Sequence, residues 1–383
     1  MIVVIADDLT GAAEVGGLGL RYGLNVDVVT DIDQPVIADL LVIATDTRSM
    51  SEQHALKTMS EITLKINKLK PDLIFKKVDS VLRGHIIAEL NVQLKHFGIK
   101  TALLVPANPA LGRTLTNGNY FIDGQPINLT SFAHDPEFSV TSADVHRMLH
   151  VNKGEVAILA NHEALLQPGI IVGECITEND LKLWANKVCE KVLLAGGSGF
   201  FTAILESLGL EVQTNKKHID FGKNALFICG STFIKSRQLV NQVKNENGPV
   251  SYMPIEIVKL ANPPESLFEQ WADEVASLIN LHKKAIVAIH ENTTTSMEVI
   301  TGSLREKKAR LVKKVFQRLK LNELLIEGGS TAASIIKQLN FDRFIPIQEF
   351  STGVIRMKVD KHEDLFLTLK PGSYDWPPHI WNF

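Results

Sequence analysis

The stretch MIVVIADDLTGA, residues 1–12, decides the fold class of this chain. An apolar run is followed by two acids, and Thr10 and Gly11 then open a segment with the spacing of a helix. An apolar run without alternation is typical of a strand that is buried on both faces of a parallel sheet. The stretch therefore predicts a strand, a polar turn and a helix, which is the repeating unit of an α/β fold.

The same unit recurs along the first half of the chain, where apolar runs alternate with helical patterns such as the amphipathic stretch 51–69. The predicted strands are VDVVT (26–30), LLVIATD (40–46), DLIFKKVD (72–79), TALLVPA (101–107), VAIL (156–159), IIVGE (170–174) and KVLLAGG (191–197). We expect them to form one sheet with helices on both faces.

The pattern restarts after the polar segment QTNKKHIDFGK, residues 213–223, which is the best candidate for a linker. The later apolar runs are ALFICGS (225–231), AIVAIH (285–290), ELLIEGG (323–329), FIPIQEF (344–350) and GVIRMKV (353–359), and the last two are expected to pair antiparallel. A chain of 383 residues is too long for one comfortable core. We therefore predict two doubly wound, Rossmann-like α/β domains, residues 1–215 and 222–383, with a cleft between them.

Composition and charge argue against several classes of function. The net charge is −3, so the chain has no basic field that would attract nucleic acid or an anionic membrane. No apolar run approaches the roughly 18 residues that span a bilayer, and the first residues lack the basic region of a signal peptide. Cys175, Cys189 and Cys229 have no CxxC spacing, which favours a reducing cytoplasm and no structural zinc.

Polar residues gather where the predicted strands of the first half end, which is where ligands bind in doubly wound sheets. The candidates are Asp7, Asp8, Arg48, Lys77, Asp79, Ser80 and Arg83. Arg48, Arg83 and Lys77 would bind a carboxylate, whereas the acids and the hydroxyl would bind alcohol groups, so this set suits a polyhydroxylated acid. Each position also has a structural reading: Asp8 or Thr10 caps a helix, Arg48 pairs with Asp46 at the surface, and Asp79 lies in a salt-bridged loop.

A long loop, residues 106–127, is rich in Pro, Gly and Asn. Loops of this length in a compact domain are often functional, although a structural flap is an equal alternative. NGNYFIDGQPI predicts a short hairpin within it, and Arg113, Thr114 and Asn117 are its polar candidates.

The second half contains turns that suit phosphate but no Walker lysine, because neither GxxxxGK[ST] nor GxGxxG after a first strand is present. IEGGSTAASII, residues 326–336, places Gly328 and Gly329 before a helix that begins near Thr331. The first N–H groups and the dipole of such a helix favour an anion. CGSTFIKSRQ (229–238) is a similar turn and KPGSY (370–374) a further glycine loop; ordinary capping by Ser or Thr is the alternative at each turn.

Taken in order, these blocks resemble the four-carbon acid sugar kinases, a family that includes 3-oxo-tetronate, D-threonate and D-erythronate kinases. The blocks are ADDLTGA (6–12), DTRS (46–49), KKVDSVLRG (76–84), residues 106–127 with AHDP (133–136), CGSTFIKSRQ, IEGGSTAASII and LKPGS (369–373), and they cover nearly the whole chain. The resemblance implies an N-terminal domain that binds substrate and a C-terminal domain that binds nucleotide. It also implies ATP-dependent phosphorylation of a terminal hydroxyl, usually the 4-OH, of a tetronate or oxo-tetronate.

The resemblance further implies roles for individual residues. The sugar acid would be contacted by Asp8, Arg48, Lys77, Asp79, Ser80 and Arg83, and Asp7 is counted with them as a second carboxylate. ATP would be contacted by Ser231, Gly328, Gly329, Ser330, Thr331 and Gly372, with Mg²⁺ bridging the phosphates. Asp8 or Asp79 would accept or orient the proton of the reacting hydroxyl.

Two other functions are compatible with the sequence. KPGSYDWPPHIW stands where the family commonly has KSGxFG, and Phe233 where a serine is usual, so a sugar-acid sensor with a degenerate ATP half is one alternative. A nicotinamide-dependent oxidoreductase acting on sugar acids is the other, although the missing GxGxxG argues against it. The sequence determines neither the stereochemistry of the substrate nor the oligomeric state, and it is compatible with a homodimer.

Overall fold

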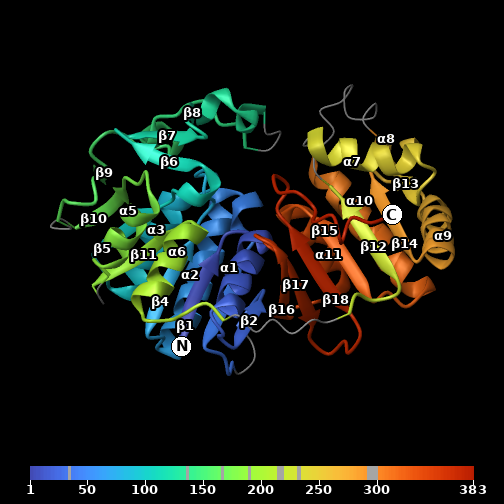
Figure 1. The fold of residues 1–383 in the computed structure, drawn as a ribbon, viewed down its shortest axis with the longest axis horizontal. Coiled ribbons are helices and arrows are strands. Elements are labelled where there is room, and N and C mark those ends of the chain that lie inside the picture. Colours follow the sequence, from blue (N-terminus) through green and yellow to red (C-terminus); the bar gives the residue numbers. More distant parts are fainter. Residues whose placement is uncertain are drawn as a thin grey trace. The chain divides into compact units, whose positions relative to one another are not determined.

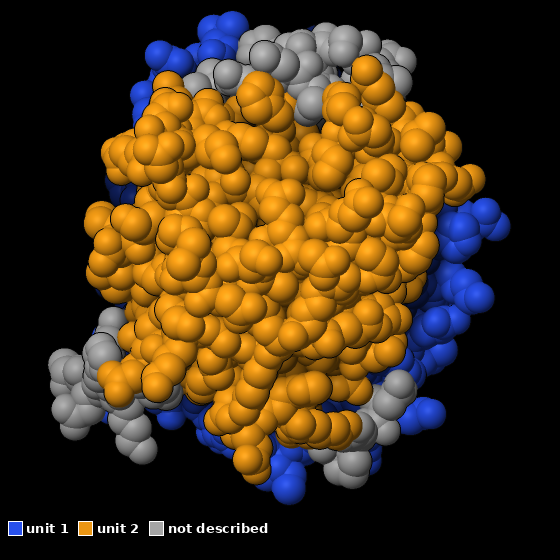
Figure 2. All heavy atoms as spheres, turned by 90° about the vertical axis from the view of Figure 1, so that its right-hand side faces the viewer, with its two compact units in different colours: residues 1–214 blue, residues 215–383 orange. Residues whose placement is uncertain are grey.

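The structure is a computed structural model (Figure 1). It describes residues 1–32, 36–134, 138–164, 168–188, 191–213, 220–230, 234–290 and 301–383. The chain divides into two compact units, residues 1–214 and 215–383, which Figure 2 colours blue and orange. Each unit contains a mostly parallel sheet with helices packed on it, so the predicted α/β class is confirmed.

The first unit is built on an all-parallel sheet whose carboxyl ends meet at one edge. Its strands are β1 (Ile2–Ala6), β2 (Val26–Val29), β3 (Leu40–Ala44), β4 (Leu73–Lys77), β5 (Thr101–Val105), β9 (Val156–Leu159), β10 (Gly169–Gly173) and β11 (Val192–Gly196). Their spatial order is β2-β3-β1-β4-β11-β5-β10-β9. The register aligns Ala6 with Ala44 and Lys77, and Gly196 with Lys77 and Val105. The segments that follow β3, β1, β4, β11 and β5 therefore start side by side.

Helices cover both faces of this sheet because successive strand residues point to opposite sides. Leu41 joins Val3, Ile5 and Ile43 in an apolar cluster with α2 (Glu52–Leu69) and α3 (Ile86–Phe97). Its neighbour Leu40 faces α1 (Leu9–Arg21), where a Cβ on Gly19 would approach Leu40 Cδ2 to 2.4 Å. Burial of each such aliphatic side chain contributes about 1.5–3 kcal/mol to the free energy of unfolding. The remaining helices are α4 (Val145–Met148), α5 (Glu178–Ala185) and α6 (Ser198–Ser207).

The long loop of the first unit folds into a small antiparallel sheet of β6 (Arg113–Thr116), β7 (Asn119–Ile122) and β8 (Gln125–Pro126). The predicted hairpin is confirmed, and a second hairpin precedes it. Asn117 and Gly118 link one pair of strands, Asp123 and Gly124 the other, and all four have positive φ. Asn-Gly and Asp-Gly tolerate this conformation best, which is why such short turns form here.

The second unit has a mixed sheet. Its strands are β12 (Ala225–Cys229), β13 (Val250–Tyr252), β14 (Lys284–Ala288), β15 (Glu323–Glu327), β16 (Arg343–Ser351), β17 (Val354–Val359) and β18 (Phe366–Lys370), in the order β13-β14-β12-β15-β18-β17-β16. In this order, the first five strands are parallel to one another. β17 pairs antiparallel with both β18 and β16, and the pairing with β16 was predicted for the last two apolar runs.

Two groups of elements pack on this second sheet. The helices are α7 (Ile234–Asn245), α8 (Ile255–Lys259), α9 (Glu265–His282), α10 (Thr301–Arg318) and α11 (Gly329–Leu339), and α10 packs against both α9 and α11. Phe227 of β12 meets the rings of Trp376, Trp381 and Phe383 of the C-terminal segment at centroid distances of 5.6, 5.6 and 5.0 Å. The sequence patterns did not anticipate β13, α9 or β18. No helix in the described ranges is both long and apolar enough to cross a membrane.

Candidate active site

Five adjacent strands of the first unit end in one polar cluster. Asp7 and Asp8 follow β1, Arg48 lies in a single 3₁₀ turn (Thr47–Ser49) after β3, and Asp79 and Arg83 follow β4. We call these five residues the strand-end cluster. The structure also places Lys77 and Ser80 beside it, so all seven positions predicted for the sugar acid lie at this edge. β11 and β5 contribute Ser198 and Asn108.

The two adjacent acids divide two tasks between them. Asp8 is the N-cap of α1: its Oδ1 accepts from the Gly11 amide at 2.8 Å, and its Oδ2 accepts from Thr10 Oγ1 at 2.6 Å. Asp7 instead accepts two parallel hydrogen bonds from Arg48, from Nε at 2.9 Å and from Nη2 at 2.8 Å. Capping thus accounts for one acid, as predicted, and the second acid binds an arginine of the chain.

Arg48 is the centre of the strand-end cluster. Its Nη1 donates to Asp8 Oδ2 at 3.1 Å and lies 3.8 Å from Asp79 Oδ1. Burial alone would lower the pKa of Arg48, but the carboxylates of Asp7, Asp8 and Asp79 raise it well above its usual value. Only 11% of its side chain is exposed, so the alternative of a surface arginine paired with Asp46 is wrong.

Asp79 and Arg83 form the salt-bridged loop that was considered as an alternative. Arg83 donates from Nε to Oδ2 at 2.7 Å and from Nη2 to Oδ1 at 2.9 Å, and its backbone amide also reaches Oδ2 at 3.2 Å. Burial raises the pKa of Asp79, but Arg83 and Arg48 more than reverse this effect, so its pKa falls well below the usual range. For Asp8 too, Arg48 and the hydrogen bond from Thr10 overcome burial and lower the pKa. Both carboxylates are therefore ionised and are weak bases.

A second network of polar contacts extends the site, and its members Glu14, Ser198 and Asn108 were not identified from the sequence as site residues. Lys77 Nζ donates to the Val78 carbonyl at 2.9 Å and lies 3.7 Å from Glu14 Oε2. Glu14 Oε1 accepts from Ser198 Oγ at 2.9 Å, and that hydroxyl accepts from Asn108 Nδ2 at 3.1 Å. Two signals could have found these residues: Ser198 directly follows a predicted strand, and Glu14 is an acid within an apolar helix segment.

The long loop closes the site from the side of Ser80. Arg113 Nη1 donates to Ser80 Oγ, and the Tyr120 hydroxyl donates to the Ser80 carbonyl. The guanidinium carbons of Arg113 and Arg83 lie 6.0 and 5.6 Å from the centroid of the Phe132 ring. Among the residues that the structure describes, Arg113 has no carboxylate partner at ion-pair distance, which distinguishes it from Arg48 and Arg83.

In the second unit, the predicted phosphate turn lies at the carboxyl ends of β15 and β18. Gly328, at φ +93°, is the N-cap of α11, and no side chain caps this helix within the described part of the chain. The alternative of ordinary Ser or Thr capping is therefore wrong at this turn. β15 and β18 are paired from Glu323 and Phe366 to Glu327 and Lys370, so the segment with Gly372 starts beside Gly328–Thr331. Ser231 lies outside the described residues.

Two buried charged residues, Glu327 and Lys370, lie next to this turn as the last residues of β15 and β18. Glu327 is fully buried; its Oε2 accepts from Ser236 Oγ at 2.7 Å, and its Oε1 lies 3.6 Å from Lys370 Nζ. Lys370 also donates to the carbonyls of Pro371 at 3.0 Å and Tyr374 at 2.5 Å. Burial lowers the pKa of Lys370, and Glu327 offsets part of this effect. Lys370 therefore fixes the conformation of the loop 371–374 through its hydrogen bonds to two backbone carbonyls.

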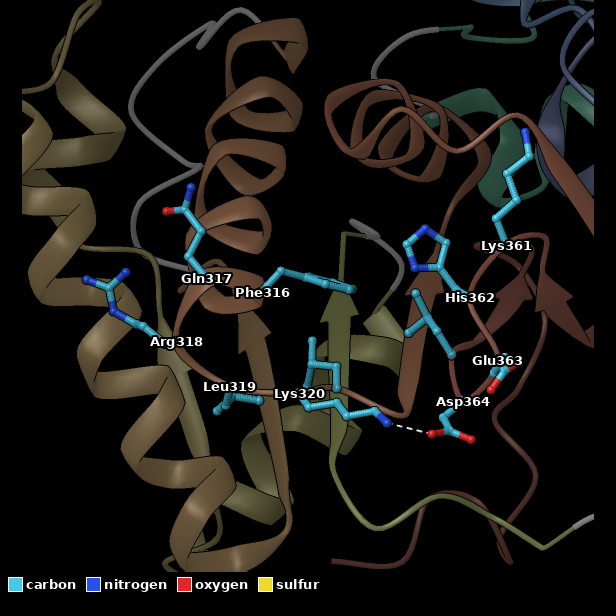
Figure 3. A pocket seen from close by; sticks show the side chains of 11 residues that line it. Phe316, Gln317, Arg318, Leu319, Lys320, Lys361, His362, Glu363 and Asp364 are labelled. Carbon is cyan, nitrogen blue, oxygen red and sulfur yellow. Dashed lines mark hydrogen bonds and ion pairs between the residues drawn. The ribbon is translucent and has the colours of Figure 1, made fainter.

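A separate surface cavity of about 660 Å³ lies between the end of α10 and the segment that precedes β18 (Figure 3). Leu321 and Leu365 lie just before β15 and β18, and Lys320 pairs with Asp364 at 2.5 Å across the lining. The cavity is thus at the amino ends of these strands. Ligands of open parallel sheets bind at the carboxyl ends, so we do not assign the site to this cavity.

Comparison with known proteins assigns sugar binding to the first unit and nucleotide binding to the second. Residues 2–204 match a family described as a sugar-binding N-terminal domain, and residues 226–374 match a family described as a nucleotide-binding C-terminal domain. The D-threonate kinase of Salmonella typhimurium is 24% identical over 90% of this chain and 87% of its own length. The 3-oxo-tetronate kinase of Actinobacillus succinogenes is 23% identical over 98% of this chain and 96% of its own.

The fold is also found among solved structures. The crystal structure of Haemophilus influenzae protein HI1011 superposes with a TM-score of 0.71 at 20% identity, covering 97% of both chains. A sugar-binding α/β domain followed by a nucleotide-binding α/β domain defines a class of small-molecule kinase. Within that class, the chain belongs to the four-carbon acid sugar kinase family, as its sequence resemblance implied.

Proposed function

We propose that the protein transfers the γ-phosphate of Mg-ATP to the terminal 4-hydroxyl of a four-carbon sugar acid such as threonate, erythronate or an oxo-tetronate. The observation that carries this proposal is the convergence of five strand ends on one cluster of charged and polar residues in the sugar-binding half. The uncapped glycine turn of the nucleotide-binding half supports the use of ATP, because free amides at a helix start bind phosphate.

Charge pairing in the site assigns the substrate groups. Arg48 and Arg83 are each held by carboxylates of the chain, so they add positive charge but have few free donors. Arg113 is the better partner for the substrate carboxylate, with Ser80 beside it. Asp8, Asp79 and Lys77 would then bind the hydroxyl groups of the substrate. This assignment shifts the main carboxylate contact from Arg48, Arg83 and Lys77, which the sequence favoured, to Arg113.

Asp8 and Asp79 are suited to orient the reacting hydroxyl rather than to remove its proton early. Both have a pKa below the usual range because Arg48 faces both and Arg83 pairs with Asp79. Phosphoryl transfer needs mainly alignment and charge neutralisation, so a weak base at the hydroxyl is sufficient. Mg²⁺ would enter with ATP; in the described ranges, no group of three or more His, Cys, Asp or Glu side chains is placed to hold a metal ion.

The test is a coupled ADP-release assay with Mg-ATP and a panel of four-carbon sugar acids and their oxo forms. We expect one acid to give strong, saturable turnover, and omission of Mg²⁺ to abolish it. Silence across the panel, together with an increase in Tm on adding ATP, would favour the sensor alternative. Reduction or oxidation of a nicotinamide cofactor by any of these acids would contradict the kinase assignment.

A further inference from the structure

Helix α10 delivers a buried lysine to the phosphate turn. α10 ends shortly before β15 begins, so its first turns lie toward the carboxyl ends of the strands. The Lys308 residue is only 2% exposed. A Cβ built on Gly230, the first residue after β12, would lie 3.2 Å from Lys308 Nζ and 2.6 Å from Thr331 Oγ1. The ammonium group and the hydroxyl therefore face the same small space beside Gly230.

The ammonium group of Lys308 makes no hydrogen bond or ion pair with another residue in the described ranges, and its Nζ is not one of the fully buried, unpartnered side-chain atoms there. The adjacent Lys307 is also buried, but its Nζ donates to the carbonyls of Leu260 at 2.9 Å and Val258 at 3.3 Å. A lysine with a structural role is satisfied in this way. The ammonium group of Lys308 instead lies beside Gly230 without a bond to another described residue.

The charged groups around Lys308 do not complete its coordination. Glu327 and Cys229 face it from β15 and β12, and Arg305 lies on its own helix. Glu327 Oε2 accepts from Ser236, whereas its Oε1 lies 3.6 Å from Lys370 Nζ and accepts no hydrogen bond from a described residue. The uncapped amides at the start of α11 add positive potential to the same place. Lys308 of α10, Lys370 of β18 and the first amides of α11 therefore bring positive charge to the same side of this turn.

We propose that Lys308 binds a phosphate of the nucleotide, a role that the P-loop lysine has in other nucleotide-binding proteins. Thr331 and the first amides of α11 would hold the same phosphate group, since the Thr331 hydroxyl and the ammonium group converge beside Gly230. A side chain at position 230 would collide with the Thr331 hydroxyl, so the glycine there keeps this space open. This inference rests on the proposed use of ATP, and it adds a helix that the predicted nucleotide contacts did not include.

The test is calorimetric titration of Mg-ATP, Mg-ADP and adenosine into the full-length wild type and the Lys308→Met variant. We expect Lys308→Met to weaken ATP binding at least about tenfold and adenosine binding less than about twofold, because only the former has phosphates for the ammonium group. Lys313→Met is the matched control, since it removes the same charge from an exposed position of the same helix.

A pH series gives an independent readout. Burial lowers the pKa of Lys308 to about 8, while Cys229 and Glu327 raise it and Arg305 lowers it further. Cys229 has a pKa well above its usual value, so the lysine is expected to titrate first. ATP affinity of the wild type should therefore fall as the pH rises through about 8, whereas that of Lys308→Met should stay level.

The outcomes separate this inference from the proposed function. Equal ATP affinity of wild type and Lys308→Met, or an equal loss for adenosine and ATP, would overturn the role of Lys308 alone. A wild type that binds none of the three ligands would overturn both the role of Lys308 and the proposed use of ATP. Selective loss of the phosphate-bearing ligands, with Lys313→Met unchanged, is the result that supports the proposal.

Discussion

The two strand-end sites of this protein handle charge in opposite ways. In the first unit, Asp7, Asp8 and Asp79 are matched by Arg48 and Arg83 in a closely bonded cluster. In the second unit, Glu327 lies 3.6 Å from Lys370 Nζ, and Lys308 makes no hydrogen bond or ion pair within the described ranges, although Glu327 and Cys229 raise its pKa. The first arrangement is held in place by hydrogen bonds and has one carboxylate more than it has guanidinium groups, whereas the second has one ammonium group more than it has carboxylates.

This difference matches the ligands that the two halves are proposed to bind. A sugar acid carries one negative charge and several hydroxyls, so recognition depends on hydrogen bonds with fixed geometry. ATP carries several negative charges on its phosphates, and an unmatched cation with free helix amides attracts such a group most strongly. The comparison predicts that substitutions in the strand-end cluster damage both stability and sugar-acid turnover, whereas loss of Lys308 damages nucleotide affinity alone.

The largest expected effect comes from breaking the paired cluster with Arg48→Met. This change leaves three buried carboxylates without their central cation, which should cost about 3–5 kcal/mol of the free energy of unfolding. Sugar-acid turnover should fall by more than about a thousandfold. Denaturant unfolding and the ADP-release assay measure these two effects.

Arg147→Met is the control for Arg48→Met, since Arg147 is an exposed arginine of the same unit. The double variant Arg48→Met with Asp7→Asn should recover part of the lost stability, because one of the unpaired charges is removed with its partner. Full stability of the single variant would contradict the view that the cluster is mutually dependent.

Asp79→Asn is expected to weaken sugar-acid binding more than catalysis. A carboxylate with a low pKa orients the substrate, so KM should rise about tenfold or more while kcat falls less. A loss confined to kcat would identify Asp79 as the base instead. Asp8→Asn keeps an oxygen that can cap α1, so the same measurement on this variant reports mainly the loss of the charge that faces Arg48.

The acid stability of the same variant gives a second test. Because the pKa of Asp79 is lower in the folded than in the unfolded protein, its contribution is complete above the unfolded value of about 3.8. It is lost as the pH falls below that value. The unfolding free energy of Asp79→Asn should therefore depend less on pH than that of the wild type between about pH 4 and pH 2.

Arg113→Gln sharpens the comparison within the first unit. Arg113 pairs with no carboxylate in the described part of the chain, so its loss should change the free energy of unfolding by less than about 1 kcal/mol. KM for the sugar acid should nevertheless rise about ten- to a hundredfold if Arg113 holds the substrate carboxylate. An unchanged KM would return that role to Arg48 and Arg83, and steady-state kinetics distinguishes the two.

The smallest expected effect is on the stability of Lys308→Met. Removing an unpaired buried ammonium should leave Tm unchanged or raise it slightly, in contrast to Lys307→Met, which loses two bonds to backbone carbonyls. Since the pKa of Lys308 is lowered to about 8, wild-type stability should rise with pH from about 8 toward 10.5, where only the unfolded lysine still binds its proton. The advantage of Lys308→Met should shrink over that range, as thermal unfolding would reveal.

Much of the fold was predictable because apolar runs and helical spacing are local signals. The strand–turn–helix units of the first half, the hairpin after Asn117 and the antiparallel pair β16–β17 all follow from such patterns. β18, with the sequence FLTLK, was missed because a short strand of this kind has no clear boundary and is defined by its pairing with β15 and β17. α9 was missed although Phe268, Trp271, Val275 and Ile279 recur at helical spacing, so the local signal was present there.

The sequence by itself determined which polar residues stand at strand ends, because it shows where each apolar run stops. That was enough to find Asp7, Asp8, Arg48 and the Gly328 turn. Only the tertiary structure decided which charges neutralise one another and which do not. Arg48 and Asp7 are 41 positions apart, and Lys308 lies within a basic helix of ordinary appearance. Ion pairing depends on distance and burial, and both are set by how the strands and helices pack.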